Sequence, residues 1–236
     1  MGQPLFQFQD YAPRPLEIID TTLREGQQTS LLHDHYKYYF NQQDKVEIVQ
    51  ALITYGVKFI ELFAPVVSPQ EKEDFQAIRA ARDNLITQKG YTFLLAHVRT
   101  PPADIEAAID AGFDGLNMYI GTSLQSRRFN HGKDLDSIIR RARELIEDVH
   151  RHAPHLILRF SGEDAFRTPW PDLVRVYDEI APLVDRFGTP DTVGIATPAR
   201  VRERVQKLRE RYPHVALEGH FHDDRGFALT NTLAAV

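Results

Sequence analysis

The stretch 20–28 reads Asp20-Thr21-Thr22-Leu23-Arg24-Glu25-Gly26-Gln27-Gln28, and the stretch 219–224 reads Gly219-His220-Phe221-His222-Asp223-Asp224. Each is typical of a buried β-strand that ends in a polar loop. Strand periodicity places His220 and His222 on one face of their strand and Phe221 on the other. Two imidazoles on one face, with a carboxylate alongside, would form a cation site with open coordination positions. Alone, a His-x-His pair is more often two ordinary histidines than a pair of metal ligands.

Between these stretches, short apolar segments alternate with amphipathic ones, at a repeat of about 30 residues that corresponds to one βα unit. The apolar segments are nearly continuous, which is typical of parallel strands covered by helices on both faces. Strands are expected at 16–22, 59–63, 92–98, 115–120, 156–161, 192–196 and 216–222. Helices are expected at 43–55, 70–84, 103–111, 135–152, 170–184 and 198–212. The pattern predicts an α/β fold, a TIM-type (β/α) barrel.

The expected strands account for seven of the eight units that a closed barrel needs. We expect residues 1–15 to form a lead segment and residues 16–236 to form one barrel domain that is incomplete at its C-terminus. Such a barrel exposes two apolar strand edges, so either the barrel is shortened or a partner supplies the missing unit. An open doubly wound sheet is the alternative, but no Gly-x-Gly-x-x-Gly turn supports it.

Composition narrows the class of protein. The 236 residues are 42% hydrophobic and carry a formal net charge of −5, so no broad nucleic-acid-binding face is expected. No apolar run is long enough to span a bilayer, and the first residues lack the features of a signal peptide. The absence of cysteine excludes disulfides, thiolate ligands and a cysteine nucleophile. We expect a soluble, cytoplasmic protein without membrane or nucleic-acid partners.

Polar side chains gather where the expected strands end, which is where barrel enzymes place their active sites. They are Asp20, Arg24, Glu25, His97, Arg99, Arg159, Ser161, Glu163, Asp164, Thr192, Thr197, His220, His222 and Asp223. Simpler interpretations remain open for several of them. Arg24 and Glu25 could be an exposed ion pair, and Arg159 could pair with Glu163 or Asp164. A second His-x-His, at 33–35, is interpreted as loop.

Several motifs in a fixed order along the chain give it a specific resemblance to a known superfamily. Asp-x-Thr-Leu-Arg-Glu-Gly-x-Gln, followed near the other end by His-x-His-x-Asp, resembles the DRE-TIM metallolyase superfamily, which includes isopropylmalate synthase, homocitrate synthase and hydroxymethylglutaryl-CoA lyase. IGTS at 120–123, HGKD at 131–134 and RFSGEDAFR at 159–167 are similar to the homocitrate synthase branch. The resemblance runs from about Leu16 to the C-terminus.

The resemblance implies that Glu25, His220 and His222 bind a divalent metal, with Zn, Mn, Mg and Co all open. It implies a Claisen-type condensation of acetyl-CoA with a 2-oxo acid, 2-oxoglutarate being favoured, followed by thioester hydrolysis. Arg24 would stabilise the developing oxyanion, and Glu163 would act as an acid/base carboxylate. The residues matching positions that hold the substrate's carboxylates are His97, Arg159, Ser161 and Thr192. Asp20 would orient its neighbours.

For two of the four residues that match substrate-binding positions, a structural role is an alternative. His97 could be a hydrogen-bonded histidine without substrate contact, and Thr192 could satisfy backbone groups at a strand end. The family continues into an eighth strand and a later region that supplies a catalytic histidine, often from a neighbouring subunit. The resemblance therefore implies a homo-oligomer, as a dimer, or a complementing C-terminal chain.

The sequence departs from the homocitrate synthase pattern at Asn117-Met118-Tyr119, at Gly162, where a serine is usual, and at Ala64-Pro65. These changes leave oxaloacetate and other 2-oxo acids open as substrates. A retro-aldol lyase of the same superfamily and an inactive barrel that serves as a binding or assembly subunit are alternative functions. An iron oxygenase is a remote one, since its ligands usually lie on a β-sandwich.

Overall fold

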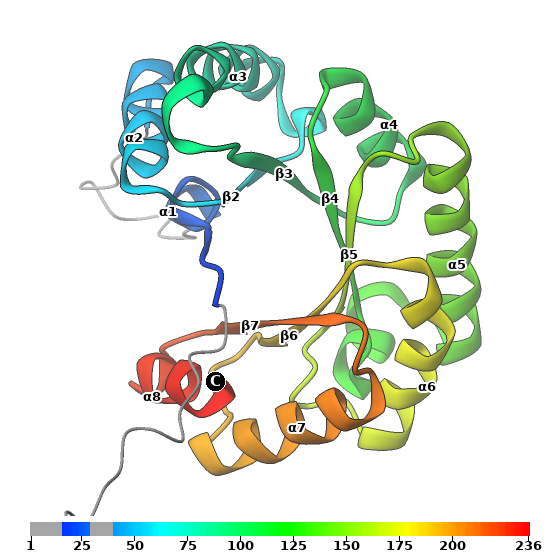
Figure 1. Ribbon diagram of the computed structural model, residues 1–236. Helices are drawn as coiled ribbons and strands as arrows, with labels where there is room; N and C mark the ends of the chain where they lie inside the picture. Colours follow the sequence, from blue (N-terminus) through cyan, green and yellow to red (C-terminus); the bar gives the residue numbers. More distant parts are fainter. Residues whose placement is uncertain (1–15, 29–39) are drawn as a thin grey trace, which may run out of the picture.

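The computed structural model describes residues 16–28 and 40–236, and in it seven parallel strands pair in chain order. The strands are β1 (Ile19–Asp20), β2 (Phe59–Phe63), β3 (Phe93–Val98), β4 (Gly115–Gly121), β5 (Ile157–Glu163), β6 (Arg186–Asp191) and β7 (Ala216–Phe221). The sheet curls into a half-barrel, with β1 and β7 at its two edges (Figure 1). The predicted TIM-type barrel with one unit missing is confirmed for the described residues.

Helices lie on the convex side of the sheet (Figure 1). They are α1 (Thr22–Gln28), α2 (Gln42–Tyr55), α3 (Pro69–Lys89), α4 (Pro102–Ala111), α5 (Leu135–His152), α6 (Trp170–Ile180), α7 (Pro198–Arg211) and α8 (Ala228–Ala235). Their starts follow from local chemistry: Asn41 and Asp44 form a capping box at α2, and the Asp134 side chain accepts a hydrogen bond at α5. None of the described helices is long and apolar enough to cross a membrane.

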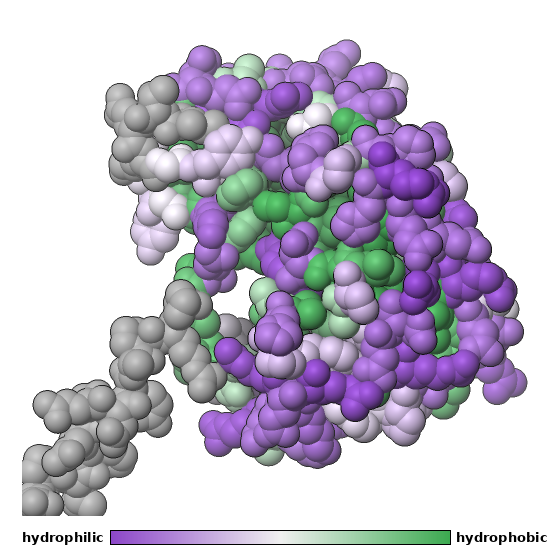
Figure 2. Space-filling view, turned by 45° about the vertical axis from the view of Figure 1, so that its right-hand side comes forward, coloured by the Kyte–Doolittle hydropathy of each residue, from purple (hydrophilic) through white to green (hydrophobic). Residues whose placement is uncertain are grey.

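The apolar core lies between the sheet and the helices, not inside the half-barrel. Outward-facing strand residues such as Leu116, Leu158 and Phe160 are buried in one cluster with the helices. The residues that alternate with them, such as Asn117 and Arg159, are polar and face inward, where both contact Glu61. Hydrophilic residues cover the outer helix surfaces, and hydrophobic residues lie deeper between them (Figure 2).

The sixth strand lies earlier than predicted. The expected strand at 192–196 is wrong, because the chain pairs with β7 over Arg186–Asp191 and turns afterwards. This strand contains an arginine, a glycine and a proline within six residues, so its sequence lacks the continuous apolar run that predicts a buried strand. Pairing of all six residues with β7 and the complete burial of Phe187 compensate for its weak strand propensity.

The first predicted strand is also corrected. Only Ile19 and Asp20 pair with β2, and the segment after them is helix α1 instead of a polar loop. The Asp20 carboxylate accepts hydrogen bonds from the Thr22 backbone N–H and hydroxyl, each at 3.0 Å. Asp20 thus bonds to the first residue of α1, and its role in orienting the site stays a prediction. Residues 1–15, and the His-x-His at 33–35, lie outside the described residues.

Candidate active site

A cavity of about 200 Å³ opens at the carboxyl ends of the strands. It is lined by Arg24, Glu25, Gln28, Glu61, His97, Tyr119, Arg159, Ser161, Glu163, Pro190, Thr192, Glu218, His220 and His222. Every catalytic, substrate-binding and metal-binding residue proposed from the sequence therefore faces one cavity. The roles of these residues stay predictions. Gln28, Glu61, Tyr119, Pro190 and Glu218 were missed.

A possible metal centre lies between the two edges of the sheet. Glu25 from α1 and His220 and His222 from the end of β7 each offer one donor atom, and these atoms all lie within 4.8 Å of one another. Nε2 of His220 is 3.1 Å from Oε1 of Glu25. The hydrogen bond from His220, together with the charge of Arg24, lowers the pKa of Glu25 to about 2 against the opposing effect of burial. The carboxyl group is therefore ionised at neutral pH.

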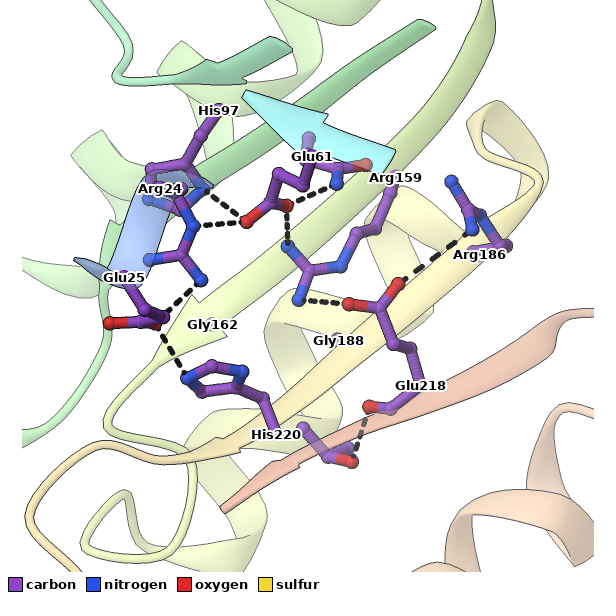
Figure 3. Close-up of polar contacts among 12 residues, drawn as sticks. Arg24, Glu25, Glu61, His97, Arg159, Gly162, Arg186, Gly188, Glu218 and His220 are labelled. Atoms are coloured by element: carbon purple, nitrogen blue, oxygen red, sulfur yellow. Dashed lines mark hydrogen bonds and ion pairs between the residues drawn. The ribbon is translucent and has the colours of Figure 1, made fainter. Parts of the chain in front are cut away.

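Arg24 is buried beside this centre, 6% exposed. Its Nη2 is 2.7 Å from Glu25 Oε1, its Nη1 donates to Gln28 Oε1 at 2.8 Å, and its Nε contacts Glu61. The pair with Glu25 exists, but it is not the solvated surface pair of the simpler interpretation. Contacts on three sides fix the guanidinium at the cavity wall, and those with Glu25 and Glu61 are drawn in Figure 3.

Glu61 is the shared acceptor beneath the cavity (Figure 3). It contacts Arg24 and Asn117, and lies 3.4 Å from Nδ1 of His97 and 3.9 Å from Nη1 of Arg159. Burial opposes its ionisation, yet His97 and the two arginines hold the pKa of Glu61 well below its usual range. One sequence signal could have found it: a single acidic residue in the apolar strand Phe59–Phe63.

A second buried carboxylate pairs with the predicted substrate arginine. Glu218 lies 2.7 Å from Nη2 of Arg159 and 3.8 Å from Nη1 of Arg186. Burial raises the pKa of Glu218 more than Arg159 and Arg186 lower it. Arg159 thus pairs with Glu218 and Glu61, and no contact with Glu163 or Asp164 supports the alternative considered from sequence.

Three further residues that the sequence predicted, Ser161, Thr192 and Glu163, line the cavity with polar groups. Ser161 Oγ is buried and has no hydrogen-bond partner among the described residues. Thr192 Oγ1 accepts the Asp164 N–H at 2.9 Å, so it satisfies a backbone group and still lines the cavity. Burial, and then the charge of Asp164, raises the pKa of Glu163.

His97 completes the wall. Its ring stacks on Tyr119 with centroids 4.3 Å apart, and burial lowers its pKa despite the neighbouring Glu61. A neutral imidazole whose Nδ1 faces a carboxylate carries its proton on Nδ1. Nδ1 lies 3.4 Å from Glu61 but makes no hydrogen bond among the described residues, and the ring lines the cavity, so the role of His97 stays a prediction.

The fold and the site define a TIM-type half-barrel with a candidate metal centre of two histidines and one carboxylate. The chain belongs to the HMGL-like family, whose model matches residues 15–236. It is 37% identical over 221 residues to the cytosolic isozyme of homocitrate synthase from Saccharomyces cerevisiae, covering 93% of this chain and 48% of that one. It is 32% identical over 220 residues to a homocitrate synthase from Sulfolobus acidocaldarius, covering 92% and 44%.

The chain thus spans about half the length of the curated relatives that it matches. Among solved structures, the hydroxymethylglutaryl-CoA lyase of Pseudomonas aeruginosa superposes with a TM-score of 0.74 at 22% identity, covering 94% of this chain and 73% of that chain. This likeness shows the fold alone.

Proposed function

We propose that the protein condenses acetyl-CoA with a 2-oxo dicarboxylic acid, 2-oxoglutarate being favoured, as an acyltransferase of the homocitrate synthase type. The observation that carries the proposal is that one cavity joins Glu25, His220 and His222 to Arg24 on one side and to Arg159 and its neighbours on the other. The names of the relatives support the same reaction.

The donor set fits a divalent metal. One ionised carboxylate and two imidazoles converge within 4.8 Å, and this mixture of oxygen and nitrogen donors accommodates Zn, Mn, Co or Mg. A metal held there supplies a Lewis acid for the carbonyl group of a 2-oxo acid. Because only these three side chains would hold the ion, a 2-oxo acid in the same cavity could complete its coordination.

The chain's own residues supply the remaining elements of the reaction. Arg24 presents a fixed positive charge next to Glu25, where an oxyanion can be stabilised without reorganisation. Burial raises the pKa of Glu163, so this carboxyl group keeps its proton to a higher pH than an exposed glutamate and is suited to exchange a proton with the substrate. Ser161 and Thr192 offer hydroxyl groups to a substrate carboxylate. Thioester hydrolysis as the final step is part of this proposal.

The partner proposed for this reaction, beyond the two substrates, is a second copy of the chain or a complementing C-terminal segment. The open side of the sheet carries the apolar residues Leu16, Ile18, Leu229 and Leu233, each at least 66% exposed. Such a surface fits another βα unit. We propose a cytoplasmic location; of the two yeast relatives, one is a cytosolic isozyme and the other is mitochondrial.

Thiol release tests the reaction. Purified protein, a divalent metal and acetyl-CoA are incubated with 2-oxoglutarate, oxaloacetate or pyruvate, and we expect release that depends on 2-oxoglutarate. Absence of release with every acid, from folded protein with bound metal, would contradict the acyltransferase proposal.

Metal binding tests the ligand set independently of turnover. Glu25→Ala and His222→Ala should each lower the affinity for Zn²⁺ at least a hundredfold, measured by competition with a chromophoric chelator. His214→Ala, which removes an exposed histidine ahead of β7, should leave the affinity unchanged. Stoichiometric, tight metal in both ligand variants would remove this ligand set.

A further inference from the structure

The sheet divides between β5 and β6 at the wall of the cavity. The β5–β6 register ends where Ser161 faces Gly188. Beyond that point β5 stays paired with β4 as far as Glu163, and β6 stays paired with β7 as far as Asp191. The two strands therefore separate from each other while each keeps its outer neighbour.

A tyrosine hydroxyl occupies the point of separation. Tyr177, on α6, is fully buried; its hydroxyl donates to the Gly188 carbonyl at 2.6 Å and accepts the Gly162 N–H at 3.3 Å. If the register continued, the Gly162 N–H would bond directly to the Gly188 carbonyl, because residue 162 would face residue 189. The hydroxyl is thus inserted into a rung of the sheet. Gly162 and Gly188 lie on neighbouring strands beside the ion pairs (Figure 3).

The two following rungs are replaced as well. The next donor from β6 toward the Gly162 carbonyl would be residue 190, which is a proline and has no N–H. The rung after that would begin at the Asp164 N–H, which bonds instead to the Thr192 side chain at 2.9 Å. Two hydroxyl groups and one proline therefore keep β5 and β6 apart over successive positions.

This separation shapes the part of the cavity that would receive a carboxylate. Ser161 lies on one side of it, and Pro190 and Thr192 lie on the other; all three line the cavity. Gly188 leaves room at its base, since a Cβ there would lie 2.4 Å from Ser161 Oγ and 2.5 Å from Arg159 Nη2. The buried Ser161 hydroxyl, without a partner among the described residues, faces this space.

We propose that Tyr177 is a positioning residue that fixes the distance between β5 and β6 and so directs Ser161 and Thr192 at the bound acid. It touches neither the acid nor the metal ligands, and it acts through the backbone at Gly162 and Gly188. The inference rests on the proposed function only in naming a 2-oxo acid as the ligand.

Tyr177→Phe tests the inference, because it removes the hydroxyl and keeps the ring that stacks on Phe187 at 4.2 Å. The variant leaves a buried N–H and a buried carbonyl to re-pair or stay unsatisfied, and either result moves the strands. We expect the dissociation constant for 2-oxoglutarate, measured calorimetrically with Zn²⁺ bound, to rise about tenfold. The affinity for Zn²⁺ alone should stay unchanged.

Tyr212→Phe is the matched control. Tyr212 belongs to the same aromatic cluster, but its hydroxyl bonds to the Val174 carbonyl and to Asp178, both on α6. It should lose stability without weakening the binding of 2-oxoglutarate. Equal weakening in both variants, or weakening of less than twofold in Tyr177→Phe, would overturn the positioning role.

A second measurement separates this inference from the proposed function. The Gly162 amide resonance should shift in Tyr177→Phe and stay in place in Tyr212→Phe, whether or not any acid binds. An unshifted resonance in Tyr177→Phe overturns the inference. Failure of the wild-type protein to bind 2-oxoglutarate, with the resonance shifted as expected, counts against the proposed function and leaves the strand separation standing.

Discussion

Glu163 shows how a side chain suited to proton transfer destabilises the fold around it. Burial and the charge of Asp164 raise its pKa above that of an unfolded chain. A carboxyl group whose folded-state pKa is raised favours folding when it is protonated, and this contribution is lost as pH rises through the folded-state pKa. At neutral pH the ionised group therefore costs stability.

Glu163→Gln should accordingly raise the melting temperature at pH 7, by about 1–3 °C for a chain of this size. The difference should shrink as pH falls toward 4, where the wild-type carboxyl is protonated too. Thermal unfolding followed by circular dichroism across this pH range measures the effect. Glu147→Gln, which changes an exposed carboxylate on α5, should show no such pH-dependent gain. A lower melting temperature of Glu163→Gln at pH 7 would contradict the raised pKa of Glu163.

Among single residues, the sequence predicted the cavity residues that stand in recognisable motifs and missed the two buried carboxylates that pair with the arginines. Arg24, Glu25, His220 and His222 stand in polar motifs at strand ends, where side chains are free to act. Glu61 and Glu218 stand within strands, where a period-two pattern allows an inward acidic residue but does not identify its partner. Their pairing with arginines from other strands depends on strand register, which a single sequence does not display.

Helix α1 illustrates how an element that carries functional groups is held from behind. Gln27 on α1 donates to Glu71 of α3 at 3.3 Å, and Lys45 of α2 bonds to Glu71 and to Asp74 at 2.6 Å each. Lys45 is 3% exposed, so it offsets two carboxylates inside the protein. This Lys45 cluster connects three helices behind Arg24 and Glu25.

Lys45→Met should destabilise the protein by about 3–5 kcal/mol, because it leaves buried carboxylates without their cation. Urea unfolding measures the loss. Lys58→Met, which removes a lysine from a half-exposed pair with Glu17, should change stability by no more than about 1 kcal/mol. A similar small change in Lys45→Met would show that the Lys45 cluster contributes little.

Helices and strands with a simple apolar pattern could be predicted from the sequence. Those whose weak local propensity is offset by contacts with other elements could not. Strand β2 occupies the predicted residues 59–63, and α5 the predicted residues 135–152. The predictions at β6 and α1 were wrong. Strand β6 begins with an arginine, whose burial beside Glu218 depends on the tertiary structure. Helix α1 has only seven residues and needs packing that local propensity does not supply.

On the scale of the whole molecule, the candidate metal centre joins regions that are far apart in sequence. Glu25 follows β1 and His220 lies on β7, which are the two edge strands of the described sheet. An ion bound by both would connect these edges, and a ligand that binds only the folded state stabilises it by mass action. The edges would then be held by the cofactor as well as by the backbone.

Adding Zn²⁺ at about a hundred times its dissociation constant should stabilise the fold by about 2.7 kcal/mol, or roughly 5–10 °C in melting temperature. Differential scanning fluorimetry with and without EDTA measures the shift. Glu25→Ala should show no shift at the same metal concentration. An equal shift in that variant would place the stabilising ion elsewhere on the protein.

The location of the apolar core has a consequence for how such a chain can diverge. Because the helices pack on the outward strand faces, most of the packing that stabilises the fold lies between strands and helices, whereas the inward faces carry the ionic groups of the candidate site. Exchanging an inward residue alters chemistry while sparing the layer that folds the chain. Related chains can thus acquire different substrates through substitutions of the inward-facing residues alone.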